Sequence, residues 1–110
     1  MIHVFDASAM IAYVRGKKGG EIVLSALLNP EVTCVAHALN LCEVYYDFHR
    51  ALSEADANQI LKELQAAGVE RREDMSLSFC RSASILKSKF RRISLANCFA
   101  LTLRKTLMPN

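Results

Sequence analysis

The stretch Ile2-His3-Val4-Phe5-Asp6-Ala7-Ser8-Ala9, at the start of the chain, decides the fold class. A short, mostly apolar run that ends in an acid is typical of a buried β-strand. Ser8 is a residue type that begins helices, and residues 9–14 have helical character up to Gly16. The stretch therefore predicts a strand, a turn and a helix, with Asp6 at the carboxyl end of the strand.

The same alternation continues along the rest of the chain. Apolar runs predict two further strands, at residues 32–36 and 69–71. Helical spacing and capping residues predict helices at residues 21–28 and 38–50, from Ser53 to Gly68, at residues 74–89, and from Ser94 to about residue 105. This order predicts an α/β fold with a parallel sheet and right-handed crossovers. Ligands in such folds bind beyond the carboxyl ends of the strands, where Asp6 lies.

Apolar spacing also predicts which side of two helices faces the core. The predicted stripe of the helix at residues 38–50 consists of Leu39, Cys42, Tyr46 and His49. The predicted stripe of the helix before Gly68 consists of Ala57, Ile60, Leu61 and Leu64.

Length and composition indicate a single domain. The chain has 110 residues and 52% hydrophobic content, enough for one core and too little for two domains. Lys and Arg number 14 against 11 acids, which gives a net charge of +3. The pI of about 8.8 falls short of the value above about 9 that marks a dedicated nucleic-acid-binding domain. The charge therefore permits RNA as a partner without requiring it.

The cysteines and the N-terminus indicate a soluble protein of the cytoplasm. Cys34, Cys42, Cys80 and Cys98 show no C-x-x-C spacing and no Cys/His spacing typical of zinc. They are expected to be small apolar core residues under reducing conditions. No charged segment precedes the first apolar run, and no stretch approaches the roughly 20 apolar residues of a membrane span.

Asp6 alone is weak evidence of function. Phosphatases of the haloacid dehalogenase type also begin with a strand that ends in Asp, but they need a second Asp where this chain has Ser8. Response-regulator receivers keep an acidic pair near the first strand, which is absent here. An acid at this position can also simply cap the next turn.

Two later stretches add polar groups that are suited to a site. In Asn40-Leu41-Cys42-Glu43 the two polar side chains are three positions apart, so they lie near one another on a helix that is otherwise apolar. In Ser94-Leu95-Ala96-Asn97, Asn97 falls near the third position of a helix capped by Ser94, where an acid is favoured. Asn97 offers a carbonyl oxygen but no charge. The alternatives are a solvated helix glutamate and an ordinary asparagine at a helix start.

In this order the three stretches resemble the PIN domain, and within it the VapC toxins of bacterial toxin–antitoxin pairs. The resemblance extends over essentially the whole chain. It implies a three-layer, Rossmann-like parallel sheet flanked by helices. It also implies a Mg2+- or Mn2+-dependent endoribonuclease that forms a homodimer and is neutralised by a cognate antitoxin. By the same resemblance Asp6 and Glu43 match the first two acids of the family site and Asn97 stands at the third position, which makes them the candidate catalytic and metal-binding residues.

The chain departs from the family pattern at two points. The third position is normally Asp, and an amide there should weaken the binding of a hard cation. Family members usually continue beyond the last helix into further strands, so a C-terminally shortened sheet is expected. Two functions therefore remain open: an impaired endoribonuclease that cleaves single-stranded or structured RNA, and an inactive PIN-like protein that binds antitoxin or RNA.

Several further residues are candidate RNA contacts. Ser8 and Asn40 stand next to the predicted site in sequence, and four cations, Lys87, Lys89, Arg91 and Arg92, crowd one short stretch before the last helix. These cations are suited to phosphate contacts, although a solvated loop is the commoner explanation of such a run. Arg15, Lys17 and Lys18 are ambiguous in the same way, and no histidine is assigned a catalytic role.

Overall fold

The computed structural model describes residues 1–108 and follows the predicted order of elements. Within these residues the elements are β1 (Ile2–Phe5), α1 (Ala7–Arg15), α2 (Gly20–Leu28), β2 (Thr33–His37), α3 (Ala38–Ala51), α4 (Glu54–Ala67), β3 (Val69–Arg72), α5 (Leu77–Lys89) and α6 (Leu95–Leu107). No helix in this part of the chain is both long and apolar enough to cross a membrane.

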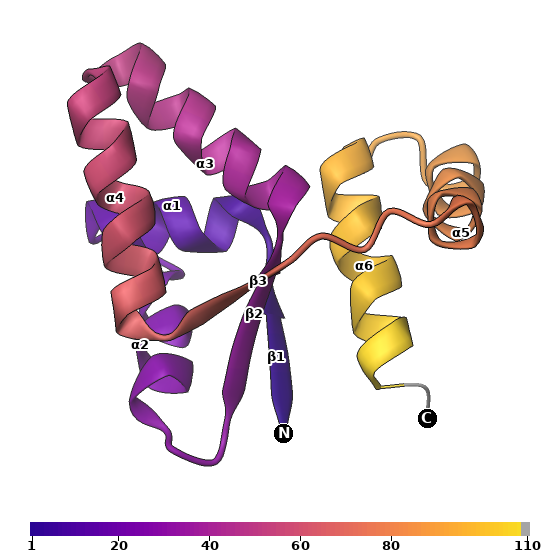
Figure 1. Cartoon of the computed structure of the whole chain (residues 1–110), viewed down its shortest axis with the longest axis horizontal. Coiled ribbons are helices and arrows are strands. Elements are labelled where there is room, and N and C mark those ends of the chain that lie inside the picture. The colour runs from indigo at the N-terminus through magenta and orange to yellow at the C-terminus, as the bar shows by residue number, and fades with distance from the viewer. Residues whose placement is uncertain (109–110) are drawn as a thin grey trace.

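The sheet is parallel and has helices on both faces. Its strand order is β1-β2-β3, with Val4 opposite Val35 and Cys34 opposite Val69. Helices α1 and α2 connect β1 to β2, and α3 and α4 connect β2 to β3. Figure 1 shows these four helices on one side of the sheet and α5 and α6 on the other. The predicted α/β fold with a parallel sheet and three layers is confirmed.

Each face of the sheet has its own core, because successive side chains of a strand point to opposite faces. On β2, Cys34 and Ala36 pack into the larger core under the first four helices, together with Met10 and Phe48. Val35, between them in sequence, packs into the smaller core. The smaller core is formed with α5 and α6 and contains Phe79, Ala83, Cys98, Phe99 and Leu103.

Two predicted helix starts are corrected. Ser8 does not cap α1. The helix begins at Ala7, and Asp6 is its cap, since Asp6 has extended backbone and its Oδ1 accepts a hydrogen bond of 2.9 Å from the N–H of Ala9. Helix α5 begins at Leu77 rather than at residue 74, because the cap is Ser76, whose Oγ accepts from the N–H of Phe79.

The predicted buried stripe of α3 is wrong, whereas that of α4 is confirmed. The residues of α3 that are buried are Asn40, Val44 and Phe48, and Cys42, Tyr46 and His49 are exposed. The side of α3 that packs inward therefore includes a polar residue and excludes several apolar ones. The cysteine prediction holds for Cys34 and Cys98, which are buried, and fails for the exposed Cys42. Burial raises the pKa of the Cys34 thiol.

His37 ties the end of β2 to three neighbouring elements. Its Nδ1 accepts a hydrogen bond from the N–H of Leu39 and so caps α3. Its Nε2 therefore carries the proton, which it donates to the backbone oxygen of Asp74 at 2.8 Å. The fully buried ring lies 5.5 Å from that of Phe79 and 5.1 Å from that of Phe99. This histidine has a structural role, which the sequence alone did not indicate.

The ion pair between Arg72 and Asp74, at the end of β3, should make the stability of the fold depend on acid pH. Arg72 donates two hydrogen bonds to the Asp74 carboxylate, at 3.0 and 3.1 Å, which lower the pKa of Asp74. A carboxyl whose pKa is lower in the folded state stabilises the fold above its unfolded pKa, about 3.9 for Asp, and that contribution is lost as the pH falls towards the folded pKa.

We expect Asp74→Asn to remove this contribution, about 1 kcal/mol or less for a partly exposed pair. Urea unfolding of both proteins at pH 7 and pH 3 measures it. The difference in free energy of unfolding between wild type and variant should shrink at pH 3. Glu73→Gln, which leaves Asp74 intact, should keep the wild-type acid dependence. A difference that is the same at both pH values would show that the pair does not act in this way.

Candidate functional site

Asp6 and Asn97, at opposite ends of the sequence, line one small cavity at the carboxyl end of β1. The cavity has a volume of about 260 Å³. Its walls are Val4, Asp6, Ile93, Asn97, Ala100, Leu101 and Arg104. Two of the three predicted site residues therefore come together where parallel α/β sheets bind their ligands.

Asp6 holds the start of α1 with one carboxylate oxygen and keeps the other free. Oδ1 accepts from the N–H of Ala9. Oδ2 accepts no hydrogen bond from residues 1–108. Every buried side-chain oxygen in this part of the chain has a partner, so Oδ2 is not buried and is open to solvent or to a ligand. The half-buried carboxylate is thus fixed in position and has a coordination site available.

Asn97 is positioned by the predicted cap of α6. The Oγ of Ser94 accepts from the N–H of Asn97 at 3.1 Å, which makes Asn97 the third residue of the helix. The Asn97 side chain is half-buried and makes no side-chain hydrogen bond among the described residues. Its amide oxygen is therefore available to a ligand in the cavity.

Asn40 joins the two elements that carry Asp6 and Asn97. Its side chain is fully buried. Oδ1 accepts from the N–H of Ala7 at 3.3 Å, and Nδ2 donates to the carbonyl oxygen of Ala96 at 3.1 Å. The expectation that Asn40 contacts RNA is corrected, because both ends of its amide are bonded to backbone inside the protein.

Glu43, the third predicted site residue, is exposed on α3. It follows Asn40 by three positions, so the two side chains are neighbours on the helix surface. Glu43 does not line the cavity of Asp6 and Asn97. Asn40 bonds this helix to Ala7 and Ala96, the neighbours of Asp6 and Asn97 in sequence, and the convergence of the Glu43 and Asp6 carboxylates stays a prediction.

The three candidate residues offer oxygen ligands of the kind that Mg2+ and Mn2+ prefer. They supply two carboxylates and one amide oxygen. Among residues 1–108, no group of three or more His, Cys, Asp or Glu side chains could hold a metal ion. Of the three candidates, Asp6 and Asn97 line the cavity, so a cation held there would take one carboxylate oxygen and one amide oxygen from these residues. The donor chemistry fits a hard divalent cation, with one negative charge fewer than three acids would give.

Arg104 is a functional candidate that the sequence reasoning missed. It lines the same cavity, from the same helix as Asn97. Residues seven positions apart face the same side of an α-helix, and this spacing from Asn97 was the available signal. Its guanidinium is suited to bind a phosphate that enters beside Asp6.

The predicted basic RNA contacts have separate roles. Lys87 is a structural residue, because its Nζ donates to the carbonyl oxygens of Arg91 and Ile93 at 2.7 and 2.8 Å. Lys89, Arg91 and Arg92 are exposed and form no ion pair within the described part of the chain. Ser8 is exposed in the first turn of α1, two residues after Asp6.

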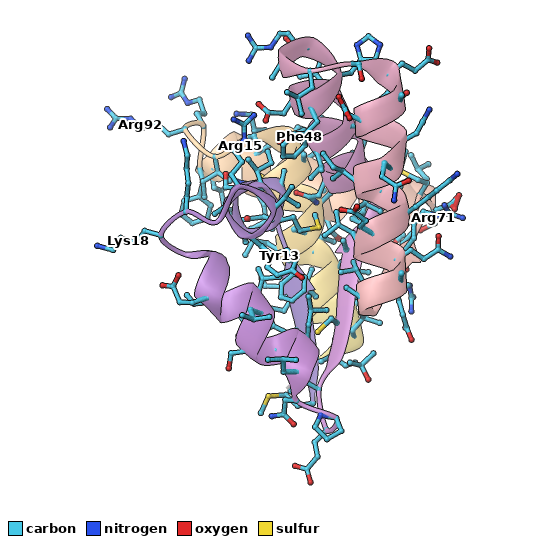
Figure 2. All side chains as sticks on the ribbon, turned by 90° about the vertical axis from the view of Figure 1, so that its left-hand side faces the viewer. Tyr13, Arg15, Lys18, Phe48, Arg71 and Arg92 are labelled. Atoms are coloured by element: carbon cyan, nitrogen blue, oxygen red, sulfur yellow. The ribbon has the colours of Figure 1, made fainter. Side chains whose placement is uncertain are left out.

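Arg15 holds α1 against α3. Its guanidinium bonds to Asp47 at 2.8 Å and lies 4.8 Å from the centre of the Phe48 ring. Figure 2 shows Arg15 beside Phe48, with Lys18 pointing away from the molecule. Arg15 is thus already engaged within the protein.

Charge is strongly segregated along the chain. Residues 75–110 contain seven of the 14 basic residues and none of the 11 acids, whereas residues 1–74 contain the other seven basic residues and all the acids. The layer of α5 and α6 is therefore electropositive, and it forms one wall of the Asp6 cavity. Such a surface attracts polyanions.

A wider hollow lies elsewhere, among α3, α4 and β3. Its volume is about 1340 Å³ and its walls include Leu41, Tyr45, Leu61 and Val69. None of the predicted site residues lines it. We therefore place the candidate site at the cavity of Asp6, where two of the predicted polar residues meet, and not in this larger hollow.

No model of a known protein family matches the chain, and no curated protein matches it.

The two hydrogen bonds of Asn40 predict a large effect of its removal. Asn40→Ala should lower the free energy of unfolding by about 1–3 kcal/mol, because the buried N–H of Ala7 loses its partner. Asn58→Ala, at an exposed position of α4, is the matched control and should change it by about 0.5 kcal/mol or less. Chemical denaturation measures both. Similar effects of the two substitutions would contradict the role of Asn40.

Proposed function

We propose that this chain is a PIN-like protein of the VapC type, a Mg2+- or Mn2+-dependent endoribonuclease with activity reduced by the amide at position 97. The observation that carries the proposal is the shared cavity of Asp6 and Asn97 at the carboxyl end of β1. It is supported by Asn40, which bonds to the residue after Asp6 and to the residue before Asn97. The order of these motifs along a parallel α/β sheet is also what the resemblance implies.

The side chains suit hydrolysis of a phosphodiester. Asp6, Glu43 and Asn97 would hold the cation, which when bound activates water and neutralises phosphate charge. Glu43 is exposed and can accept a proton from an incoming water. Arg104 can bind the phosphate at the cavity wall. The hydrogen bond from Ala9 fixes one oxygen of the Asp6 carboxylate at the start of α1 and so orients the other.

One observation favours a second candidate function, RNA binding without cleavage. The site has an amide where a third carboxylate would bind the cation most strongly, yet residues 75–110 keep seven cations and no acid. Loss of cation affinity would abolish cleavage and leave the attraction of the α5–α6 layer for RNA intact. In the cytoplasm, either form would be expected to bind a cognate antitoxin.

The substitution Asn97→Asp tests the proposed enzyme. It should tighten Mn2+ binding about tenfold or more, since hard cations bind largely through anionic oxygens, and should increase Mg2+- and Mn2+-dependent cleavage of a fluorogenic single-stranded RNA. Calorimetry and initial rates measure these effects. Asn58→Asp makes the same change of charge on the exposed face of α4 and should leave both unchanged.

A further substitution identifies the site of any cleavage. Asp6→Asn in the Asn97→Asp background keeps a residue that caps helices well while it removes a carboxylate, so the fold should persist and cleavage should disappear. If Asn97→Asp neither binds Mn2+ more tightly nor cleaves RNA, the endoribonuclease is rejected. RNA binding without cleavage in every variant would favour the second candidate.

The proposed homodimer makes a separate prediction. In the sheet described by residues 1–108, β1 and β3 are the edge strands, and open strand edges recruit other chains. Sedimentation at increasing concentration should give a mass above the 12.3 kDa of one chain. A single species of monomer mass at every concentration would contradict the dimer.

A further inference from the structure

The turn between α5 and α6 is held rigidly by its own hydrogen bonds. The N–H of Ile93 donates to the carbonyl oxygen of Phe90 at 3.0 Å, and the N–H of Phe90 donates to that of Leu86 at 2.8 Å. Lys87 reaches across from α5 and donates to the carbonyl oxygens of Arg91 and Ile93. The backbone of residues 90–93 is therefore fixed on the end of α5.

The same turn presents its side chains to solvent. The Phe90 side chain is 53% exposed, and Arg91 and Arg92 are exposed. Figure 2 shows Arg92 pointing away from the ribbon. Among the described residues, neither arginine forms an ion pair and no cation lies over the Phe90 ring. A rigid turn thus carries an aromatic ring and two cations that have no partner in this part of the protein.

The chemistry of the turn fits a single-stranded nucleic acid. Proteins bind single strands through aromatic rings that stack on bases and cations that contact the backbone. No acid lies between residues 75 and 110, so no neighbouring carboxylate in the sequence competes for the arginines. An acidic peptide without aromatic side chains would satisfy the cations but would leave the exposed ring of Phe90 without a stacking partner.

The turn leads directly to the candidate site. Ile93, its last residue, lines the cavity of Asp6 and Asn97, and Arg104 lies on the wall of the same cavity. A strand bound at the turn therefore has a path to the cavity, with a second cation available there.

We propose that residues 90–92 dock single-stranded RNA, with Phe90 stacked on a base and Arg91 and Arg92 on the adjacent phosphates. The identity of the strand as a substrate rests on the proposed function, whereas its docking does not require cleavage. Lys87 acts as a positioning residue that fixes the turn.

Fluorescence anisotropy of a labelled single-stranded RNA, measured in EDTA so that no cleavage occurs, tests this proposal. Phe90→Ala should weaken binding about 5- to 150-fold, the range for loss of one stacked base. The loss should vanish on an abasic strand of the same length. Arg91→Gln and Arg92→Gln should each reduce the slope of log affinity against log salt by about 0.7.

Two exposed positions outside the turn serve as controls. Leu77→Ala removes a side chain that is 68% exposed at the far end of α5, and Lys62→Gln removes an exposed cation of α4, outside the electropositive layer. Both should bind the RNA as wild type does. The chain contains no Trp, so Phe90→Trp introduces a single tryptophan. This variant should retain affinity, and its tryptophan fluorescence should be quenched when a base stacks on the ring.

Any of the following binding results would overturn the proposal: wild-type affinity of Phe90→Ala, an equal loss on the abasic strand, an equal loss in Leu77→Ala, or polyglutamate that competes as well as RNA. The test of RNA docking and the test of RNA cleavage can fail independently. Docking with this pattern but no cleavage by Asn97→Asp would reject only the endoribonuclease. Cleavage by Asn97→Asp with a KM that Phe90→Ala leaves unchanged would reject only the docking site.

Discussion

The arrangement around the candidate site depends on one buried amide. Asn40 supplies an acceptor to the first helical N–H of α1 and a donor to a carbonyl in the first turn of α6. The early N–H groups of a helix have no partner within that helix, and a buried group without a partner costs about 1–3 kcal/mol. The same side chain therefore satisfies backbone and fixes the relative position of Asp6 and Asn97.

A second buried polar residue, His37, also ties separate elements together through hydrogen bonds to backbone. His37 ends β2, caps α3 and holds the carbonyl of Asp74 in the linker that leads to α5. Its ring packs between two phenylalanines of the smaller core. The beginning of α3 is thus fixed by His37 and Asn40 together, and Glu43 follows one turn later on the same helix.

Local signals in the sequence predicted the elements well. Ser53, Gly68 and Ser94 mark helix ends through contacts within a few residues, and the structure places them as expected. The buried face of α3 was not predictable in this way. Asn40 is buried because its partners are residues 7 and 96, which are distant in sequence, and an apolar residue such as Tyr46 stays exposed because no element covers it.

The candidate site was predictable only where local motifs mark its residues. Asp6 and Asn97 stand in motifs whose topology brings strand and helix ends together, and they share a cavity. For Arg104 the only signal in the sequence was its position seven residues after Asn97, on the same side of the helix. The role of Lys87 depends on where two backbone carbonyls lie, which no side-chain pattern reveals.

We propose that Asp6, Glu43 and Asn97 form one cation site, with Asn40 holding the elements that carry them. Titration of isotope-labelled protein with Mn2+ tests this most directly, because the paramagnetic ion broadens the amide signals of nearby residues. The signals of Ala7, Glu43 and Asn97 should broaden first and together, and at lower Mn2+ in Asn97→Asp. Broadening centred on Glu73 and Asp74, with Ala7 and Asn97 unaffected, would contradict it.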